Sequence, residues 1–327
     1  MNRAELIEFL GNDWNKVQKC ISDALDTDIE MLRALNEELL SHSGKQLRPM
    51  LCLLMARACR PENVDGLPRE SICYAAAAEL LHNATLIHDD VADSSDCRRG
   101  HPTVLSLIGP SAAVLLGDFW LARAVETFNK CNYDERIHSL FTKTLGDLSQ
   151  GEMLQLEKAD KADTSIDDYL RIIYCKTGSL FETACVSGAV SASASPQFIE
   201  AARNFSKYLG LAFQIKDDIL DYVGNEEIGK PLGSDLREHK ITLPLLGALV
   251  NNPSQEIRVR SLLREESDPA TLESIRSFVL ENGGVAYAQG VLDEYVRKAE
   301  DSLSVFPPSE AREYLLQLAQ YNSTRTL

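Results

Sequence analysis

Apolar residues recur at helical spacing over long stretches of this chain, and alternation typical of strands is scarce. Residues 71–93 include four successive alanines from Ala75, which predicts one long helix. Residues 198–222 predict a second helix that ends near Gly224. Between 111 and 195 there is no proline, so this segment has room for several long helices.

Proline and glycine break this helical pattern only at short intervals. The breaks fall at 60–68, 99–102, 109–110, 194–196, 224–234, 252–253 and 307–308. None is long enough for a flexible linker, and no repeat has a solenoid period. We therefore predict an all-α fold, a single large helical bundle in which residues 1–327 form one domain. Its central helices would be nearly apolar on several faces.

The charge balance narrows the classes of partner. The chain has 33 basic and 49 acidic residues, a formal net charge of −16, which argues against a nucleic-acid partner. An anionic substrate remains possible, because local cations or bound metals can reverse the sign within a site. No apolar run approaches the length of a membrane span, and the start of the chain has no signal-peptide core. We expect a cytoplasmic protein without stable membrane insertion.

The 8 cysteines give no sign of a metal site or of a disulfide framework. None forms a CxxC pair, and no Cys-His cluster has zinc spacing. Most lie in apolar context, so we expect reduced thiols packed as small hydrophobic residues.

Two acidic clusters have the form DDxxD. Their members are Asp89, Asp90 and Asp93 in the first, and Asp217, Asp218 and Asp221 in the second. The first and last aspartates of each cluster share a helix face, where like charges repel. A single cluster of this kind is often a solvated helix end. Two clusters with apolar flanks indicate a compensating cation, and clustered oxygens with room for water and phosphate suit Mg²⁺.

Cations gather near these clusters in sequence. Lys45 and Arg48 precede a long apolar stretch, Arg98 and Arg99 follow the first acidic cluster, and Lys176 lies within an apolar run. A glycine-punctuated loop at 229–235 carries Lys230, with Lys240 after it. Each lysine or arginine alone is typical of a surface charge. Together with paired metal carboxylates, they indicate a substrate set with two diphosphates.

In this order, the motifs resemble those of the trans-polyprenyl diphosphate synthases, the family of farnesyl, geranylgeranyl and long-chain polyprenyl synthases. The resemblance spans about residues 30–320 and is greatest to the long-chain bacterial type. It rests on residues 43–49 (GGKRxRP in the family), 89–100, 151–155 (GExxQ), 176–177 (KT), 213–221 (FQxxDDxxD) and 229–240 (GKPxGxD with a following lysine). Ser43 and Gln46 depart from the first motif, replacing a glycine and an arginine.

The resemblance implies an isoprenoid synthase bundle with a central cavity, about three Mg²⁺ ions, and isopentenyl and allylic diphosphates as substrates. It implies that Asp89, Asp93 and Asp217 bind metal directly. Asp90, Asp218 and Asp221 would then support the metal through water.

The resemblance also implies roles for the cations. Isopentenyl diphosphate would be bound by Lys45, Arg48, His82 and Arg99. The allylic diphosphate would be bound by Arg98, Lys176 and Lys230. The Thr177 carbonyl and the Gln214 side chain are candidate dipoles that face the carbocation. His82 alone is more typical of a packed core histidine, but its place seven residues before Asp89 matches the family.

Three other functions remain as alternatives. A class I terpene cyclase also carries DDxxD, but its second metal motif mixes Asn or Asp with Ser or Thr and Glu, whereas this chain has Asp217-Asp218-Ile219-Leu220-Asp221. A non-catalytic partner subunit would have lost aspartates, and both clusters are intact here. A medium-chain synthase of the geranylgeranyl type is the third alternative.

Product length depends on side chains below the first acidic cluster. Thr85 and Ala84 lie roughly 6–7.5 Å before Asp89 along a helix. Short-chain members of the family have aromatic residues at these positions, which form the floor of the cavity, whereas both residues are small here. Leu81, one turn further along the helix, is of middling size. We therefore predict a long product of six or more isoprene units. A twenty- or twenty-five-carbon product is the alternative, with Phe119 or Trp120 as candidate floors.

The segment 107–128 mixes apolar residues with little charge after Pro110. An apolar helix of this kind needs a partner, and the resemblance implies a homodimer formed through this region. Packing within the domain is the alternative.

Overall fold

The two long helices expected from the sequence are both present. Helix α5 is Arg69–Ala92 and helix α11 is Pro196–Val223, each within two residues of the predicted bounds. The computed structural model describes residues 3–324 except 43, 61–65, 99, 133, 225–232 and 265–267. Over these residues the chain is all-α apart from one antiparallel pair of two-residue strands, which confirms the predicted fold class.

The chain divides into two compact units. Unit 1 comprises Met1–Thr142, Leu180–Arg203 and Leu303–Gln317, and unit 2 comprises Lys143–Ser179, Asn204–Ser302 and Leu318–Leu327. Four helices contribute residues to both units: α8 (Glu135–Lys161), α10 (Ser179–Ser191), α11 and α17 (Glu310–Thr324). That residues 1–327 form one domain with a central cavity stays a prediction.

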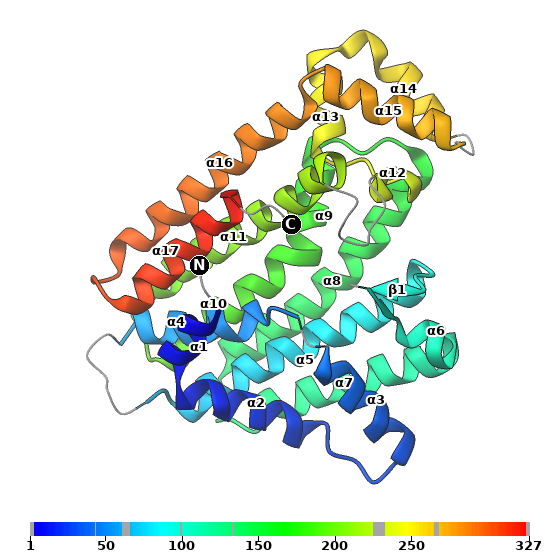
Figure 1. Cartoon of the computed structure of the whole chain (residues 1–327). Coiled ribbons are helices and arrows are strands. Elements are labelled where there is room, and N and C mark those ends of the chain that lie inside the picture. Colours follow the sequence, from blue (N-terminus) through cyan, green and yellow to red (C-terminus); the bar gives the residue numbers. More distant parts are fainter. Residues whose placement is uncertain are drawn as a thin grey trace. The chain divides into compact units, whose positions relative to one another are not determined.

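The other elements of unit 1 come mainly from the first third of the chain (Figure 1, blue to cyan). They are α1 (Arg3–Leu10), α2 (Asn12–Ala24), α3 (Glu30–Ser41), α4 (Leu47–Ala58), α5, β1 (Cys97–Arg98), β2 (His101–Pro102), α6 (Val104–Ile108), α7 (Pro110–Asn129) and a 3-10 turn at Leu303–Val305.

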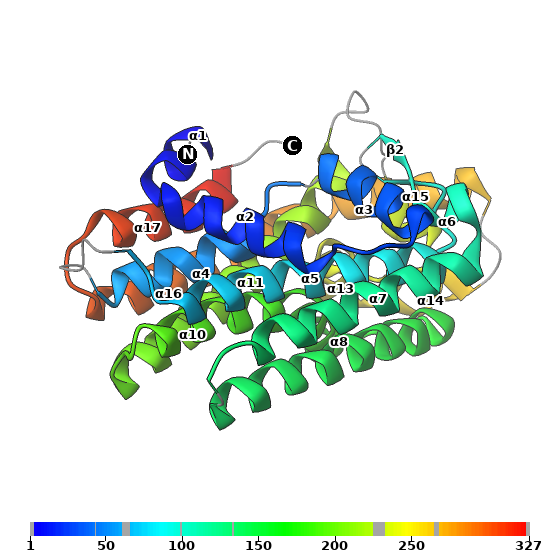
Figure 2. The same cartoon turned by 90° about the horizontal axis from the view of Figure 1, so that it is seen from below.

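Helix α5 is the centre of unit 1, because α2, α4 and α7 all pack against it. Residues Ala75–Ala78 are completely buried, so this part of the helix has no solvent-facing side, as expected for a helix apolar all round. Gly117 of α7 lies so close to His88 that a β-carbon there would collide with the imidazole. Likewise, α4 and α10 lie side by side (Figure 2), and Gly188 leaves no room for a β-carbon beside the Cys52 carbonyl.

The remaining elements of unit 2 follow in the second half of the chain. They are α9 (Ile166–Ile173), a π-helical turn at Tyr174–Gly178, α12 (Ser234–Arg237), α13 (Leu243–Asn251), a 3-10 turn at Pro253–Gln255, α14 (Glu256–Arg264), α15 (Pro269–Glu281) and α16 (Gly284–Ser302). Its core contains the apolar face of α11, including Ile215 and Ile219, with Leu245 of α13 and Leu292 of α16.

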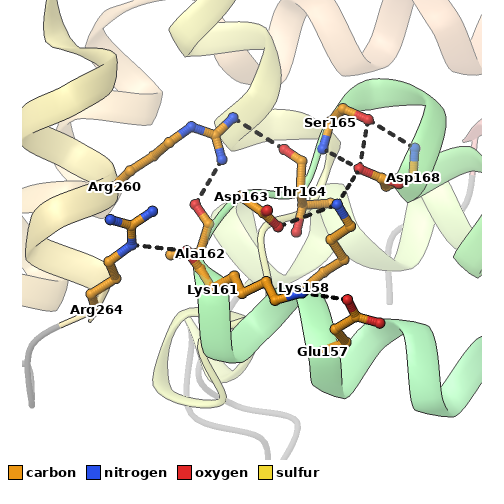
Figure 3. Close-up of polar contacts among 10 residues, drawn as sticks. All are labelled: Glu157, Lys158, Lys161, Ala162, Asp163, Thr164, Ser165, Asp168, Arg260 and Arg264. Carbon is orange, nitrogen blue, oxygen red and sulfur yellow. Dashed lines mark hydrogen bonds and ion pairs between the residues drawn. The ribbon is translucent and has the colours of Figure 1, made fainter.

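Two arginines of α14 hold the end of α8 in unit 2 (Figure 3). Arg260 donates to the carbonyls of Ala162 and Thr164 at 2.8 and 3.1 Å, and Arg264 donates to the Lys161 carbonyl at 2.8 Å. The Lys161 and Ala162 carbonyls lack helical partners because α8 ends at Lys161. The guanidinium groups therefore satisfy the orphan acceptors at the end of the helix, where positive charge is also favourable.

In the described part of the chain, every helix is too short or too polar to traverse a lipid bilayer.

Candidate functional site

The first acidic cluster lies at the C-terminal end of α5, in unit 1. Asp89 and Asp93 are half-buried, whereas Asp90 is buried with 5% exposure. The end of a helix carries partial negative charge, so three carboxylates there repel each other and the helix dipole. The arrangement therefore calls for positive charge nearby.

Arg98 supplies part of that charge from β1. Its Nε donates to Oδ1 of Asp90 at 2.7 Å, which pairs the most buried carboxylate of the cluster. The turn between them is fixed by backbone contacts, since the Ser95 amide donates to the Asp90 carbonyl at 2.9 Å. Arg98 was predicted to bind the allylic diphosphate, and the structure places it beside the first acidic cluster.

One face of α5 leads away from Asp89. His82 and Thr85 are half-buried and share the face of Asp89, whereas Leu81 and Ala84 are buried at 1% and 0% exposure. Ala84 is turned about 140° from Asp89 around the helix. Of the predicted chain-length residues, Thr85 therefore shares the face of the metal carboxylates and Ala84 does not.

The two candidate floor residues on α7 differ in placement. Trp120 is buried and donates its indole N–H to Oδ1 of Asn36 in α3 at 2.9 Å. Phe119 is half-buried beneath the Arg123 guanidinium, 4.8 Å from the ring centre. The hydrogen bond fixes Trp120 toward α3, and neither residue is established as a floor.

The first cationic motif lies at the start of α4. Lys45 is exposed and Arg48 is half-buried, with its guanidinium 5.1 Å from the ring centre of Phe181. Gln46 is buried in the left-handed conformation, with φ 51°, and its amide donates to Gln18 of α2 at 3.4 Å. The residue that departs from the family motif therefore contacts α2.

The second acidic cluster lies near the end of α11, in unit 2. Asp217 is half-buried, and Asp218 is buried with 4% exposure. The Tyr169 hydroxyl donates to Asp218 at 2.6 Å and the Gln214 amide donates to it at 2.9 Å. Burial, together with the neighbouring aspartates, raises the pKa of Asp218 to about 7 despite these two hydrogen bonds.

Asp221, the last member of this cluster, caps a short helix. Its carboxylate accepts hydrogen bonds from the Ser234 amide at 3.0 Å, the Ser234 hydroxyl at 2.6 Å and the Asp235 amide at 3.2 Å. This fixes the start of α12 against α11. Asp235 is also close, and burial with the charges of Asp218 and Asp221 raises its pKa far above the ordinary value. Negative charge is therefore concentrated in this part of unit 2.

The KT pair lies in the π-helical turn that follows α9. Lys176 donates to Glu152 and, at 3.1 Å, to Gln155, the two polar residues of the GExxQ motif on α8. A β-carbon on Gly151 would lie 2.7 Å from Cβ of Cys175, so glycine is needed for this close approach. The Thr177 hydroxyl donates to Oε1 of Gln214 at 2.9 Å. Gln214 thus connects Thr177 to Asp218.

The aspartate carboxylates of these clusters fit Mg²⁺ better than a metal ion whose ligands all come from the protein. In the described ranges, no three His, Cys, Asp or Glu side chains are arranged to hold a metal ion. The second aspartate of each cluster, Asp90 or Asp218, is engaged by protein partners, as is Asp221, and Asp89, Asp93 and Asp217 are half-buried at helix spacing. Mg²⁺ commonly binds through one or two carboxylates and completes its shell with water and substrate phosphates.

Two predicted site residues, Arg99 and Lys230, lie outside the described residues. The others are described within their own units: one acidic cluster, Arg98, His82, Lys45 and Arg48 in unit 1, and the other acidic cluster with Lys176, Thr177 and Gln214 in unit 2. Sequence reasoning missed Tyr169 and Ser234 as partners of the second cluster, because Tyr169 is in no motif and Ser234 occupies a variable position of GKPxGxD. Glu152 and Gln155 were noted as motif residues without a role.

Comparison with known proteins identifies the family of this chain. The polyprenyl synthetase family profile matches residues 29–279, so the chain belongs to this family and is a prenyltransferase of isoprenoid biosynthesis. The family uses a divalent metal to bind diphosphates.

Relatives and solved structures cover nearly the whole chain. The octaprenyl diphosphate synthase of Escherichia coli is 33% identical over 321 residues, 98% of each chain. A short chain isoprenyl diphosphate synthase of Methanothermobacter thermautotrophicus is 36% identical over 312 residues, 94% of this chain and 93% of the relative. The structure of a Caulobacter crescentus polyprenyl synthase, complexed with calcium and isoprenyl diphosphate, is similar with a TM-score of 0.90 and 34% identity, covering 100% of this chain and 98% of that one. These structural neighbours establish the isoprenoid synthase fold.

Proposed function

We propose that this protein condenses an allylic diphosphate with isopentenyl diphosphate and so builds a long trans-polyprenyl diphosphate. The observation that carries this is the pair of DDxxD clusters at helix ends, each with a carboxylate engaged by protein partners beside half-buried aspartates. The test is incubation with labelled isopentenyl diphosphate and each allylic primer, with chromatography of the products. Release of a cyclic hydrocarbon without use of isopentenyl diphosphate would instead indicate a cyclase.

In this proposal about three Mg²⁺ ions bind with the substrates. Asp89, Asp93 and Asp217 would hold them directly, and the second aspartates would orient the ligands. Asp90 is suited to that part by its ion pair with Arg98, and Asp218 by its bonds to Tyr169 and Gln214. Such partners fix a ligand's neighbours and tune the charge of the site.

The reaction has three steps: ionisation, condensation and elimination. Asp89, Asp93 and Asp217 would hold the Mg²⁺, which would supply positive charge to the diphosphate oxygens. Arg98 and Lys176 would donate hydrogen bonds to the allylic diphosphate. The Thr177 carbonyl and Gln214 face the carbocation, and Gln214 is held in one orientation because it accepts from Thr177 and donates to Asp218. The released diphosphate takes the proton lost in elimination, so no histidine base is needed.

The long product is proposed from two observations. Thr85, which shares the helix face of Asp89, is small, and the Escherichia coli relative is named an octaprenyl synthase. The relative named a short chain synthase favours the medium-length alternative. Chromatography of the wild-type product separates them, since six or more isoprene units mean at least thirty carbons.

The two diphosphate sites should respond differently to loss of a cation. We expect Lys45→Ala or Arg48→Ala to raise KM for isopentenyl diphosphate about 10–100-fold, and Lys176→Ala to do so for the allylic primer. A hydrogen bond to a charged group contributes about 1.5–3 kcal/mol, which sets this range. Initial rates with one substrate varied and the other saturating measure the effect. Lys230→Ala should resemble Lys176→Ala.

Lys19→Ala is the matched control for these variants. Lys19 pairs with Asp23 at 2.8 Å on the surface of α2, and both side chains are mostly exposed. Its removal tests whether the loss of one positive charge elsewhere on the protein changes either KM value. Equal changes in both KM values for the Lys45 and Lys176 variants would contradict separate sites.

We propose a homodimer formed through α7. Its inner face packs Leu116 and Trp120 into unit 1, whereas Val114 and Leu115 are 40% and 68% exposed. Leu107 of α6 is also 52% exposed. Apolar side chains gathered on one outer face suit a second copy of the chain. We expect Leu115→Arg to convert the dimer to a monomer. Light scattering at micromolar concentration measures this change. Ile257→Arg, at 86% exposure on α14, is the control and should leave the dimer intact. A wild-type monomer would rule out this interface.

A cytoplasmic location stays a prediction.

A further inference from the structure

His88 holds the C-terminal end of α5 against α7. Its imidazole Nε2 lies 3.3 Å from the carbonyl oxygen of Val114 and 3.3 Å from Oδ1 of Asp118, one turn further along α7. A carbonyl oxygen can only accept a hydrogen bond, so Nε2 carries the hydrogen and is the donor. His88 therefore contacts both the backbone and a side chain of the neighbouring helix.

Gly117 makes room for the imidazole on α7. A β-carbon on this residue would collide with both Nε2 and Cδ2 of His88. Val114 lies three residues before Gly117 and four before Asp118, so the three residues form a notch on one side of the helix. Glycine in a helix interior is less stable than alanine, and the close approach of His88 explains why glycine lies in the middle of α7.

The place of His88 in the sequence connects this notch to the first acidic cluster. His88 directly precedes Asp89, and successive residues of a helix are turned about 100° from each other, so the placement of the imidazole constrains the direction of the Asp89 carboxylate. The carboxylates of the cluster repel each other and the helix dipole, which favours unwinding of this helix end. Arg98 holds the end through Asp90 at 2.7 Å, and His88 adds the contact with α7.

We propose that His88 is a positioning residue for the first acidic cluster. By anchoring the end of α5 in the notch at Gly117, it holds Asp89 and Asp93 in the orientation that metal binding requires. The inference rests on the proposed function, in which these two aspartates bind Mg²⁺ directly. A misplacement of about 1 Å in a catalytic site can lower the rate about 100-fold, so loss of the anchor should reduce turnover although His88 acts only through its neighbours.

A matched pair of substitutions tests the Nε2 donor. His88→Gln places an amide N–H close to the position of Nε2, whereas His88→Asn places it near Nδ1, out of reach of α7. We expect His88→Asn to lower kcat about 10–100-fold and to raise the Mg²⁺ concentration that gives the half-maximal rate. KM for isopentenyl diphosphate should stay near the wild-type value, because Lys45 and Arg48 lie at the start of α4. His88→Gln should recover most of the lost rate, and equal losses in the two variants would overturn the proposal.

Hydrogen exchange of the metal-free protein tests the anchor without any reaction. The amides of residues 90–93 exchange when the end of α5 opens locally, which breaks bonds such as that from the Asp93 amide to the Asp89 carbonyl at 2.8 Å. We expect these amides to exchange about fivefold to tenfold faster in His88→Asn, the change that loss of one hydrogen bond gives, and at nearly the wild-type rate in His88→Gln. Unchanged exchange in His88→Asn would contradict the anchor, whether or not the protein condenses diphosphates. Failure of the anchor and failure of the proposed function are therefore distinguishable.

Gly117→Ala tests the notch from the side of α7. In the wild type the added methyl group would displace the imidazole, so both kcat and the melting temperature should fall. In a His88→Ala background there is no imidazole to displace and alanine is the better helix former. The same substitution should then leave kcat of that variant unchanged and raise its melting temperature. Gly290→Ala in α16 is the control, because a β-carbon there meets no atom within 4 Å, and it should leave kcat unchanged. An equal loss of kcat from Gly117→Ala in both backgrounds would show that the notch does not act through His88.

Discussion

Asp217→Ala and Asp89→Ala are expected to lower kcat/KM by at least about a thousand-fold, which corresponds to ~4 kcal/mol of transition-state stabilisation. Each substitution removes a proposed direct ligand from a cluster whose second aspartate is engaged elsewhere, Asp90 by Arg98 and Asp218 by Tyr169 and Gln214. Asp90 and Asp218 could replace the lost carboxylate only by giving up these bonds. Steady-state assays at saturating Mg²⁺ measure the loss.

Thermal melting separates loss of the metal from loss of the fold. The charge of Asp217 disfavours ionisation of Asp218, so Asp217→Ala removes repulsion, and the metal-free variant should melt no lower than the wild type. Addition of Mg²⁺ with a non-reactive diphosphate should raise the melting temperature of the wild type and not of the variant. Asp23→Ala, an exposed aspartate on α2, is the control. Near wild-type activity of either variant in Mg²⁺ would refute the metal assignment.

Thr85→Phe is expected to shorten the product to about fifteen or twenty carbons. Thr85 shares the face of α5 with Asp89 and lies about 6 Å before it, so an aromatic ring there would block growth away from the diphosphates. Its hydroxyl donates to the His82 carbonyl at 2.8 Å. Product length is read by chromatography after extended incubation with a large excess of isopentenyl diphosphate.

Ala84→Phe, turned about 140° from Asp89 around the helix, should shorten the product less than Thr85→Phe and cause a larger loss of stability. Ala84 is completely buried, and forcing a ring into a packed position typically costs about 1–3 kcal/mol. Thr85→Val is the matched control, since it keeps the volume, removes the hydroxyl bond and should leave product length unchanged. If Thr85→Phe and Ala84→Phe both made the wild-type product, the path of the growing chain along α5 would be wrong.

The helices could be predicted more fully than the contacts between them. The alanines of α5 and the apolar pattern of α11 define those helices locally, and both acidic clusters were placed correctly near helix ends. Local sequence is sufficient here because helix formation depends on neighbouring residues. A substrate set that carries diphosphate groups could also be inferred, because acidic and basic motifs occur together.

The partners of the site residues could not be predicted in the same way. Tyr169 lies 49 positions before Asp218 and donates to it across unit 2. The π-helical turn at Tyr174–Gly178 has no sequence signature, yet it carries Lys176 and Thr177. Such turns are frequent at functional sites, but each depends on tertiary packing. The cysteines were expected to pack as small apolar residues, and Cys52, Cys73, Cys175 and Cys185 are buried.

Arg98 and Lys176, the described cations assigned to the allylic diphosphate, each already contact a carboxylate, Asp90 and Glu152. A diphosphate that binds there must share or displace a resident counter-ion, so its capture is an exchange of ion partners. An exchange of this kind is less sensitive to ionic strength than binding to bare charges. If both cations bind the allylic diphosphate as proposed, Asp90 and Glu152 would compete with inorganic diphosphate for them after each condensation. The ion pairs that orient the two side chains would then also help to release this by-product.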